Sequence, residues 1–201
     1  MNNIQTAMHK LERNDLFSLE DYARERPAFR EKLIAHKRAR TLHLGPNLTL
    51  LFEDRLTMQY QVQEMLRAER IFEAAGIQDE LDAYNPLIPD GSNWKATMLV
   101  EFAEVDERRQ ALGRLIGLED RVWLQVQGQP RIHAIADEDM ERETEEKTSA
   151  VHFLRFELTP EMVKALKQGA GLDAGVDHAN YSHETKPVPE ALRKSLLADL
   201  A

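Results

Sequence analysis

The chain has 201 residues, of which 42% are hydrophobic, no cysteine, and a formal charge of −9 at pH 7. This length and apolar content suffice for one buried core or two small ones, and the lack of cysteine excludes disulfides, thiolate nucleophiles and protein-ligated iron–sulfur clusters. Residues 1–40 carry a net charge of +3, so the rest carries −12, which argues against a general nucleic-acid-binding protein.

The apolar runs of the chain are short. The stretches Leu48 to Phe52 and Met98 to Val100 fall far below the roughly 20 residues that a bilayer-spanning helix needs. The N-terminus has no uninterrupted apolar segment followed by a small-residue cleavage site. The sequence therefore predicts a cytoplasmic protein without a membrane segment.

The first predicted elements are helices within residues 15–40, broken near Pro27 because proline removes a backbone donor. This segment ends in the basic run AHKRAR, residues 35–40. Cations suit the C-terminal end of a helix dipole, so we expect a solvated helix end. An anion or an acidic partner bound to this run is the alternative.

A short strand is predicted at residues 41–44, before the turn Gly45-Pro46-Asn47. From Leu48 the sequence LTLLFEDRLTMQYQVQEMLRAERIFEAAG reads as the longest helix, with Asn47 as its N-cap and Gly76 just past its end. Its first turns, Leu48 to Phe52, could instead form a strand, because they are a continuous apolar run.

The segment NPLIPDGSNWK, residues 85–95, then interrupts regular structure, because its prolines and its Asp-Gly pair favour turns. The chain beyond it alternates apolar and polar residues, and the predicted elements follow one another as a strand (94–102), a helix (105–117), a hairpin (121–127 and 131–137), a strand (149–158), a helix opened by Thr159-Pro160-Glu161, a last strand (171–178) and a helix (189–200). The acidic run 137–147 reads as a solvated loop, with a contact to the basic run as the alternative.

These elements predict an α+β fold. Residues 1–84 form a helical N-terminal half, residues 85–95 a junction loop, and residues 96–201 a ferredoxin-like antiparallel sheet with two packed helices. We expect the helices and the sheet to form one compact unit.

Standard catalytic signatures such as a P-loop, HExxH or GxSxG are absent, so candidate residues come from their positions. Two polar residues fall on the apolar face of the long helix, where they need a carboxylate or an anionic ligand, although a structural ion pair is the simpler account. The junction loop adds charges, hydrogen-bonding groups and an indole ring, which either bind something or plug the core. The ligand- or partner-binding candidates are thus Arg55, Gln59, Asp90, Ser92, Asn93, Trp94 and Lys95.

Two further sets of residues could perform chemistry. General acid–base catalysis could use Glu53, Tyr60 and Glu64, which lie on the opposite face of the long helix, if the sheet covers them. A metal would have to be held by histidine and carboxylates, and the candidates are His152, His178 and His183. His152 lies on the apolar side of its strand, where a buried, hydrogen-bonded histidine is the simpler account.

Three stretches, LLFEDRLTMQYQVQEMLRAERIFEAAG, AYNPLIPDGSNWKAT and TSAVHFLRFELTPEM, resemble a bacterial family known as domain of unknown function 3501. The resemblance carries over no catalytic residues. It implies a role near iron or peroxide redox chemistry, because genes of the family often lie beside those of rubrerythrin-like proteins and iron–sulfur oxidoreductases.

Two hypotheses of function remain. The first is an accessory protein that binds such a redox partner, or a small ligand used by one, through the junction loop and the adjoining long helix. The second is an enzyme that uses a histidine and carboxylate metal site, or Glu53 and Glu64 as acid and base. The oligomeric state, and the identity of any cofactor, stay open at this point.

Overall fold

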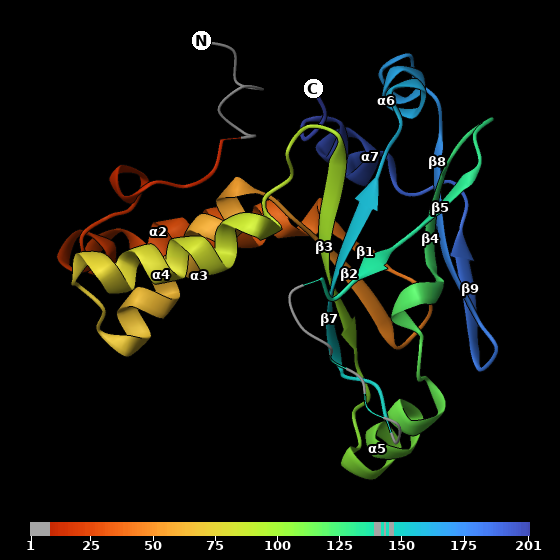
Figure 1. The fold of residues 1–201 in the computed structure, drawn as a ribbon, viewed down its shortest axis with the longest axis horizontal. Coiled ribbons are helices and arrows are strands. Elements are labelled where there is room, and N and C mark those ends of the chain that lie inside the picture. Colours follow the sequence, from red (N-terminus) through yellow and green to blue (C-terminus); the bar gives the residue numbers. More distant parts are fainter. Residues whose placement is uncertain (1–8, 139–141, 143, 145–146) are drawn as a thin grey trace.

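The chain folds into three layers in the computed structural model, which describes residues 9–138, 142, 144 and 147–201 (Figure 1). A five-stranded sheet lies between a layer of helices and a four-stranded sheet. The helical layer consists of α2 (Leu19–Arg38), α3 (Arg55–Glu69) and α4 (Ala74–Tyr84), preceded by the 3-10 turn η1 (Arg13–Asp15). Within the described part of the chain, no helix is both long and apolar enough to span a membrane.

Both sheets are antiparallel. The five-stranded sheet has the order β1-β2-β3-β7-β6, with strands β1 (Thr41–His43), β2 (Leu48–Glu53), β3 (Asn93–Val100), β7 (Val151–Glu157) and β6 (Ile135–Ala136). The four-stranded sheet has the order β5-β4-β8-β9, with strands β5 (Arg131–His133), β4 (Val122–Val126), β8 (Leu172–His178) and β9 (Tyr181–Thr185).

Short helices close the two ends of this sandwich. Helix α5 (Val105–Arg114) lies at one end, and α6 (Pro160–Lys167) and α7 (Glu190–Leu197) lie at the other (Figure 1). The remaining elements are the 3-10 turns η2 (Asn85–Leu87), which follows α4, and η3 (Glu119–Arg121), which precedes β4.

The main core fills the space between the sheets, and a smaller one lies among the helices. In β3 the buried residues Ala96, Met98 and Val100 alternate with partly exposed ones, because successive side chains of a strand point to opposite faces. The helical core is built from Met58, Val62, Leu66, Leu81, Ile88 and Leu11. Each face of the five-stranded sheet therefore has a different neighbour: the second sheet on one side and the helices on the other.

The structure confirms the α+β class but not the ferredoxin-like arrangement, which is wrong. A ferredoxin-like fold has one sheet, whereas here β3 pairs with β2 and β7, and β4 pairs with β5 and β8 in a separate sheet. Residues 1–84 are not helical throughout either, because β1 and β2 join the five-stranded sheet. The alternating segments were predicted correctly, but their distribution over two sheets was not.

The predicted long helix is in fact a strand followed by two helices. Leu48–Glu53 forms β2, as the alternative interpretation of this apolar run proposed. Helix α3 begins only after Asp54, whose side chain accepts a hydrogen bond from the Thr57 backbone N–H at 3.0 Å while the Thr57 hydroxyl accepts one from the Asp54 N–H. The helix ends at Arg70, which has a left-handed φ of 56°. Gly76 therefore lies inside α4 rather than past a helix end.

Two other expectations are corrected. Helix α2 runs through Pro27 without a break, because Pro27 and Ala23 are exposed and the carbonyl left without its helical partner can meet water. The strand at 171–178 is not the last one, since β9 pairs with it as a hairpin. The β4–β5 hairpin and the Thr159 cap of α6 are confirmed. Much of the acidic run 137–147 lies outside the described residues, so its predicted contact is not addressed.

Candidate functional site

The junction segment 85–95 has two parts with different roles, and its aromatic residue belongs to the core. Trp94 lies in β3 with 1% of its surface exposed, and its Nε1 donates a hydrogen bond to the Leu196 carbonyl at 2.9 Å. Ile88 is fully buried among the helices. The side chains of these two residues fill space in the two cores and hold the segment against them, as one of the two interpretations of the loop predicted. The side chain of Trp94 is therefore not open to a ligand.

The polar residues of the loop hold one another in a turn. Asp90 accepts hydrogen bonds from the Ser92 backbone N–H and hydroxyl and from the Asn93 amide, at 2.8 to 3.2 Å. The Ser92 hydroxyl also lies 2.8 Å from a carboxylate oxygen of Glu157, at the end of the neighbouring strand β7. Asp90, Ser92 and Asn93 thus fix the entry into β3.

The other part of the junction forms one wall of a pocket of about 670 Å³. Residues of α4 and η2 make this wall, and the opposite wall is the helix-facing side of β3 and β7. The main side chains that line it are Tyr84, Pro86, Leu87, Lys95, Glu138, Phe153 and Arg155. Lys95 faces this pocket because it alternates with Trp94 along β3. The volume lies within the range of small-molecule sites in proteins.

The pocket has a charged edge beside an apolar body. Arg155 donates two hydrogen bonds of 2.8 Å to the carboxylate of Glu138 and one of 2.5 Å to Glu157. The Arg155 hydrogen bond is the main cause that lowers the pKa of Glu138. Lys95 is partly buried, and burial lowers the pKa of its ammonium group despite the attraction of Glu138 and Asp90.

Lys95 differs from Arg155 in that no hydrogen bond or ion pair joins its ammonium group to another described residue. A partly desolvated cation without a partner gains from an anion that reaches it. Tyr84, Leu87 and Phe153 provide apolar surface within the same pocket. The arrangement can therefore hold a small organic molecule that carries a carboxylate, sulfonate or phosphate at one end.

The two candidates from the long helix, Arg55 and Gln59, lie away from this pocket. Arg55 forms an ion pair of 2.6 Å with Asp15, and Gln59 donates a hydrogen bond to the Asp15 carbonyl at 2.6 Å. Both residues therefore fasten η1 to α3, in line with the structural ion pair considered for Arg55. They also line a separate hollow of about 430 Å³ beside Arg40 and Asp199.

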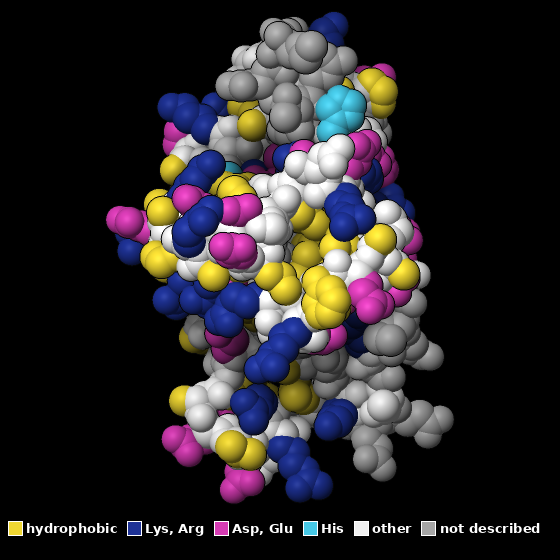
Figure 2. All heavy atoms as spheres, turned by 90° about the vertical axis from the view of Figure 1, so that its left-hand side faces the viewer, with side chains coloured by type: hydrophobic (Ala, Val, Ile, Leu, Met, Phe, Trp, Pro, Cys, Tyr) yellow, Lys and Arg dark blue, Asp and Glu magenta, His cyan; other side chains and the backbone are white. Residues whose placement is uncertain are grey.

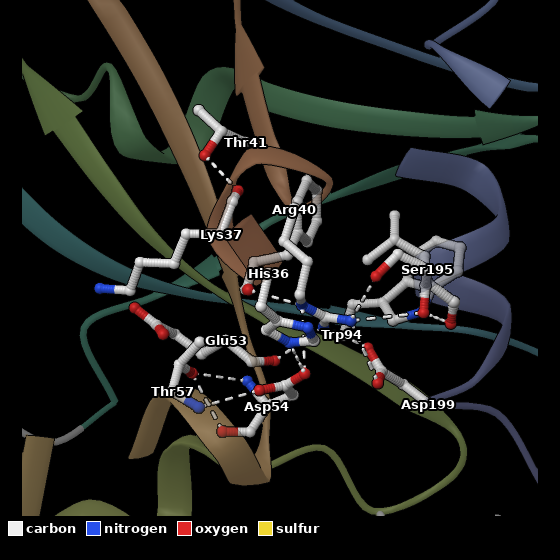
Figure 3. A network of polar contacts seen from close by, with 12 residues as sticks. His36, Lys37, Arg40, Thr41, Glu53, Asp54, Thr57, Trp94, Ser195 and Asp199 are labelled. Carbon is white, nitrogen blue, oxygen red and sulfur yellow. Dashed lines mark hydrogen bonds and ion pairs between the residues drawn. The ribbon is translucent and has the colours of Figure 1, made fainter. Parts of the chain in front are cut away.

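Arg40 is the centre of a polar network that sequence reasoning missed (Figure 3). It was expected at a solvated helix end, but only 1% of its surface is exposed. Its guanidinium donates to the carbonyls of Phe52 and Glu53 at 2.9 and 3.0 Å and contacts Asp199 at 2.5 Å. Arg40 thereby joins the end of α2 to β2 and to the C-terminal segment, and no local pattern in the sequence signals these partners.

Two carboxylates beside Arg40 are shifted in opposite directions. Burial raises the pKa of Asp199 to about 6, even though Arg40 opposes the shift. Burial alone would raise the pKa of Asp54 as well, but the hydrogen bond to His36, the charge of Arg40 and the Thr57 N–H lower it. His36 Nε2 lies 2.5 Å from Asp54 Oδ2. Because the Arg40 guanidinium already donates to acceptors on four residues, the network holds α2, β2 and the C-terminal segment together.

The acid–base candidates do not form one site. Glu53 is buried, with one oxygen accepting from the Thr97 hydroxyl at 2.6 Å and the other without a hydrogen bond to any described residue. Glu64 instead accepts from Arg26 and Tyr22, and the Arg26 hydrogen bond lowers its pKa to about 2. Tyr60 packs edge-on against Phe29. A carboxylate with so low a pKa is a poor general base at neutral pH.

Among the residues that the structure describes, His152 is the one of the three candidate metal ligands that belongs to a group able to share an ion. His152 is fully buried beside Glu119 and Asp137, the group of possible ligands found among the described residues. His178 instead contacts the Ile116 carbonyl at 3.1 Å, and His183 packs against the Tyr181 ring at 4.7 Å between ring centroids. The sequence placed His152 on the correct face but not its two acidic neighbours.

An apolar hollow also opens on the helical layer. Figure 2 shows hydrophobic side chains gathered there, with Lys and Arg side chains distributed around them. A hollow of about 460 Å³ is lined by residues of η1, α3 and α4 and the turns beside them, among them Phe17, Leu66, Ile71, Phe72 and Ile77. Phe72 is 70% exposed. Arg13, Asn14 and Ser18 also line this hollow, which has fewer charged residues than the junction pocket.

Comparisons with known proteins agree with the family resemblance. The model of a family described as "protein of unknown function (DUF3501)" matches residues 10–200. A crystal structure described as a novel protein of unknown function from Burkholderia pseudomallei K96243 is 50% identical in sequence, with a TM-score of 0.91. The match covers 96% of this chain and 100% of that one. No curated protein matches this chain significantly.

Proposed function

This chain belongs to the family described as protein of unknown function (DUF3501), and from that premise we propose that it is a binding protein that takes a small organic anion in its junction pocket. The site is the space between η2 and the helix-facing side of β3 and β7. The proposal keeps the binding role inferred for the junction segment but assigns it to Lys95 rather than to Trp94 and the turn residues.

The observation that carries the proposal is the state of Lys95. Its ammonium group is partly desolvated, faces a pocket of about 670 Å³, and has no hydrogen bond or ion pair with another described residue. Arg155 is paired with Lys95 across β3 and β7, but its guanidinium already contacts the carboxylates of Glu138 and Glu157, so of the two cations only Lys95 has no such partner among the described residues. An anion that reaches this partly desolvated ammonium group would form a charge-assisted hydrogen bond with it.

The apolar residues restrict the class of ligand. Tyr84, Leu87 and Phe153 line the pocket, so an inorganic ion would leave most of the space without contacts. An amphipathic organic acid would place its anionic group at Lys95 and its body against these side chains. Glu138, at the same edge, would repel a ligand with several negative charges.

The family resemblance adds a partner to this proposal. Genes of related proteins often lie beside those of rubrerythrin-like proteins and iron–sulfur oxidoreductases. The bound anion would then be a molecule that such a redox protein uses or releases. This part is tested by whether a purified partner of that class changes the affinity of the pocket for a probe anion.

The pocket itself is tested with 8-anilinonaphthalene-1-sulfonate, an aryl sulfonate whose fluorescence rises in apolar sites. We expect saturable binding that Lys95→Met weakens at least tenfold, about 1.4 kcal/mol. Lys194→Met is the matched control, because Lys194 is an exposed lysine of α7 outside the pocket. Leu87→Asp should also weaken binding, since it places a negative charge in the apolar part.

Two results would refute the proposal. One is an unchanged affinity of Lys95→Met with its circular dichroism spectrum preserved. The other is an equal loss in Lys194→Met, which would show that the probe responds to net charge rather than to the pocket.

A further inference from the structure

His152 lies between two carboxylates that reach it from distant parts of the sequence. Its Nδ1 is 2.5 Å from Asp137 Oδ2 and 3.7 Å from Glu119 Oε1. Glu119 begins the 3-10 turn η3, Asp137 follows β6, and His152 belongs to β7. The side chain of His152 is fully buried and the other two are 6% and 9% exposed. The three ligand atoms lie within 4.8 Å of one another.

The hydrogen bonds on the other side of the ring fix where its proton lies. Nε2 is 3.1 Å from the Ser149 carbonyl, which can only accept, so Nε2 carries a hydrogen. The Thr148 hydroxyl, 2.9 Å from Nε2, then accepts from the ring and donates to Glu119, whose oxygens are 3.2 and 3.4 Å away. In the neutral ring, Nδ1 therefore directs a lone pair at two carboxylates.

One ring nitrogen and two carboxylate oxygens that lie this close together form the donor set of a cation site. We propose that a divalent transition-metal ion occupies this position, bound by His152 Nδ1, Asp137 Oδ2 and Glu119 Oε1. One imidazole and two carboxylates suit manganese, iron(II) or zinc. The lack of thiolates does not weaken this donor set, because none of these ions requires them.

The distances agree with a site that is nearly formed. Ligands at about 2.1 Å from an ion lie about 3 Å apart at octahedral angles and about 3.4 Å apart at tetrahedral angles. The Nδ1 to Asp137 distance of 2.5 Å must therefore open by about 0.5 to 0.9 Å, and the Nδ1 to Glu119 distance of 3.7 Å must close by about 0.3 to 0.7 Å.

The residues around the ligands hold them as metal ligands are usually held. A ligating histidine commonly donates its other ring N–H to a backbone carbonyl, as His152 does to Ser149. The second oxygen of Asp137 accepts from the Phe153 N–H at 3.0 Å and from Arg142 at 3.1 Å. Asp137 also has a positive φ of 49°, a strained conformation for a residue other than glycine that is frequent at functional positions.

This centre is separate from the junction pocket although it lies behind the same strand. His152 and Phe153 are neighbours in β7 and point to opposite faces of the sheet. The metal site therefore faces the space between the two sheets, whereas Phe153 and Glu138 line the pocket. Because the two sites share no side chain, failure of one proposal leaves the other standing.

The experiment is titration of the full chain, stripped with chelator, with zinc and with manganese in separate calorimetric runs. We expect one ion per chain and a rise in melting temperature on loading, since an ion that binds only the folded state stabilises it. Glu119→Gln should weaken binding at least tenfold, because the amide keeps the side-chain volume but is a poor ligand. Asp137→Asn tests the second carboxylate in the same way.

His178→Ala is the matched control, because it removes a partly exposed histidine outside the cluster. It should bind as tightly as the parent protein. His152→Ala is a weaker test because it opens the core, so the two amide variants decide. The proposal is overturned if the stripped protein binds neither ion stoichiometrically, or if both amide variants retain the affinity of the parent.

Discussion

Two buried tryptophans offer a direct test of the roles assigned around the junction, because they differ in one interaction. Trp94 and Trp123 are each 1% exposed and belong to different sheets. The Nε1 of Trp94 donates to the Leu196 carbonyl at 2.9 Å, whereas the Nε1 of Trp123 has no hydrogen-bond partner among the described residues. Replacing each by phenylalanine removes the same atoms but only one hydrogen bond.

The expected magnitudes follow from this difference. Both substitutions lose part of an indole ring and leave some empty volume, which destabilises each variant. Trp94→Phe also removes the indole hydrogen bond to the Leu196 carbonyl, which still accepts from the Asp199 backbone N–H at 3.1 Å, so the extra cost is about 0.5 to 1.5 kcal/mol. Trp123→Phe removes a buried donor that had no partner, and the phenyl ring keeps a face toward Arg131, whose guanidinium carbon lies 3.8 Å from the indole centroid. Trp94→Phe should therefore be less stable than Trp123→Phe by about 0.5 to 1.5 kcal/mol.

The measurement is urea denaturation of both variants and the parent, followed by far-ultraviolet circular dichroism, because the fluorescence signal itself changes. The free energy of unfolding is compared only where the denaturant slopes agree. If Trp123→Phe is as destabilised as Trp94→Phe, or more so, the hydrogen bond to Leu196 does not stabilise the fold as reasoned. Trp94→Phe should also bind the aryl sulfonate probe like the parent protein, since its side chain faces away from Lys95.

Three further outcomes are expected. Glu64→Gln should make the free energy of unfolding depend less on pH in the acid range. The pKa of Glu64 is lowered to about 2, chiefly by Arg26, so its stabilising charge is fully present above the ordinary glutamate pKa of 4.5 and is lost as pH falls toward 2. Denaturation of both proteins at a series of pH values measures this difference. Arg40→Met should lower the free energy of unfolding by about 3 to 5 kcal/mol in urea denaturation at pH 7, because it leaves the buried carboxylate of Asp199 without its cation. The loss should be smaller at pH 5, where that carboxylate, with its raised pKa, takes up a proton. It should be much smaller in the double variant with Asp199→Leu. Thr159→Ala should lower stability by about 1 kcal/mol, since it removes the hydroxyl that caps α6, and an unchanged unfolding midpoint would contradict that role.

The candidate sites show which functional residues the sequence pattern could predict and which it could not. The sequence indicated Lys95 as a binding residue and His152 as a residue on the buried side of its strand. It did not indicate the partners of either, because Arg155 comes to Lys95 by strand pairing and Glu119 comes to His152 through the meeting of a 3-10 turn with β7. For Trp94 the sequence left two interpretations open, binding a ligand or filling the core, although the alternation along β3 already indicated that Trp94 and Lys95 face opposite ways.

The sequence by itself determined the local elements, because these depend on neighbours in the chain. Alternation specified β3, the turn at Gly128 specified the β4–β5 hairpin, and the hydroxyl of Thr159 specified the start of α6. Only the tertiary structure decided that Leu48–Glu53 is a strand, because a short apolar run suits a helix or a strand until β1 and β3 pair with it. It also decided that Arg40 is buried, since the carboxylate that neutralises it lies 159 residues away and no local pattern can encode such a contact.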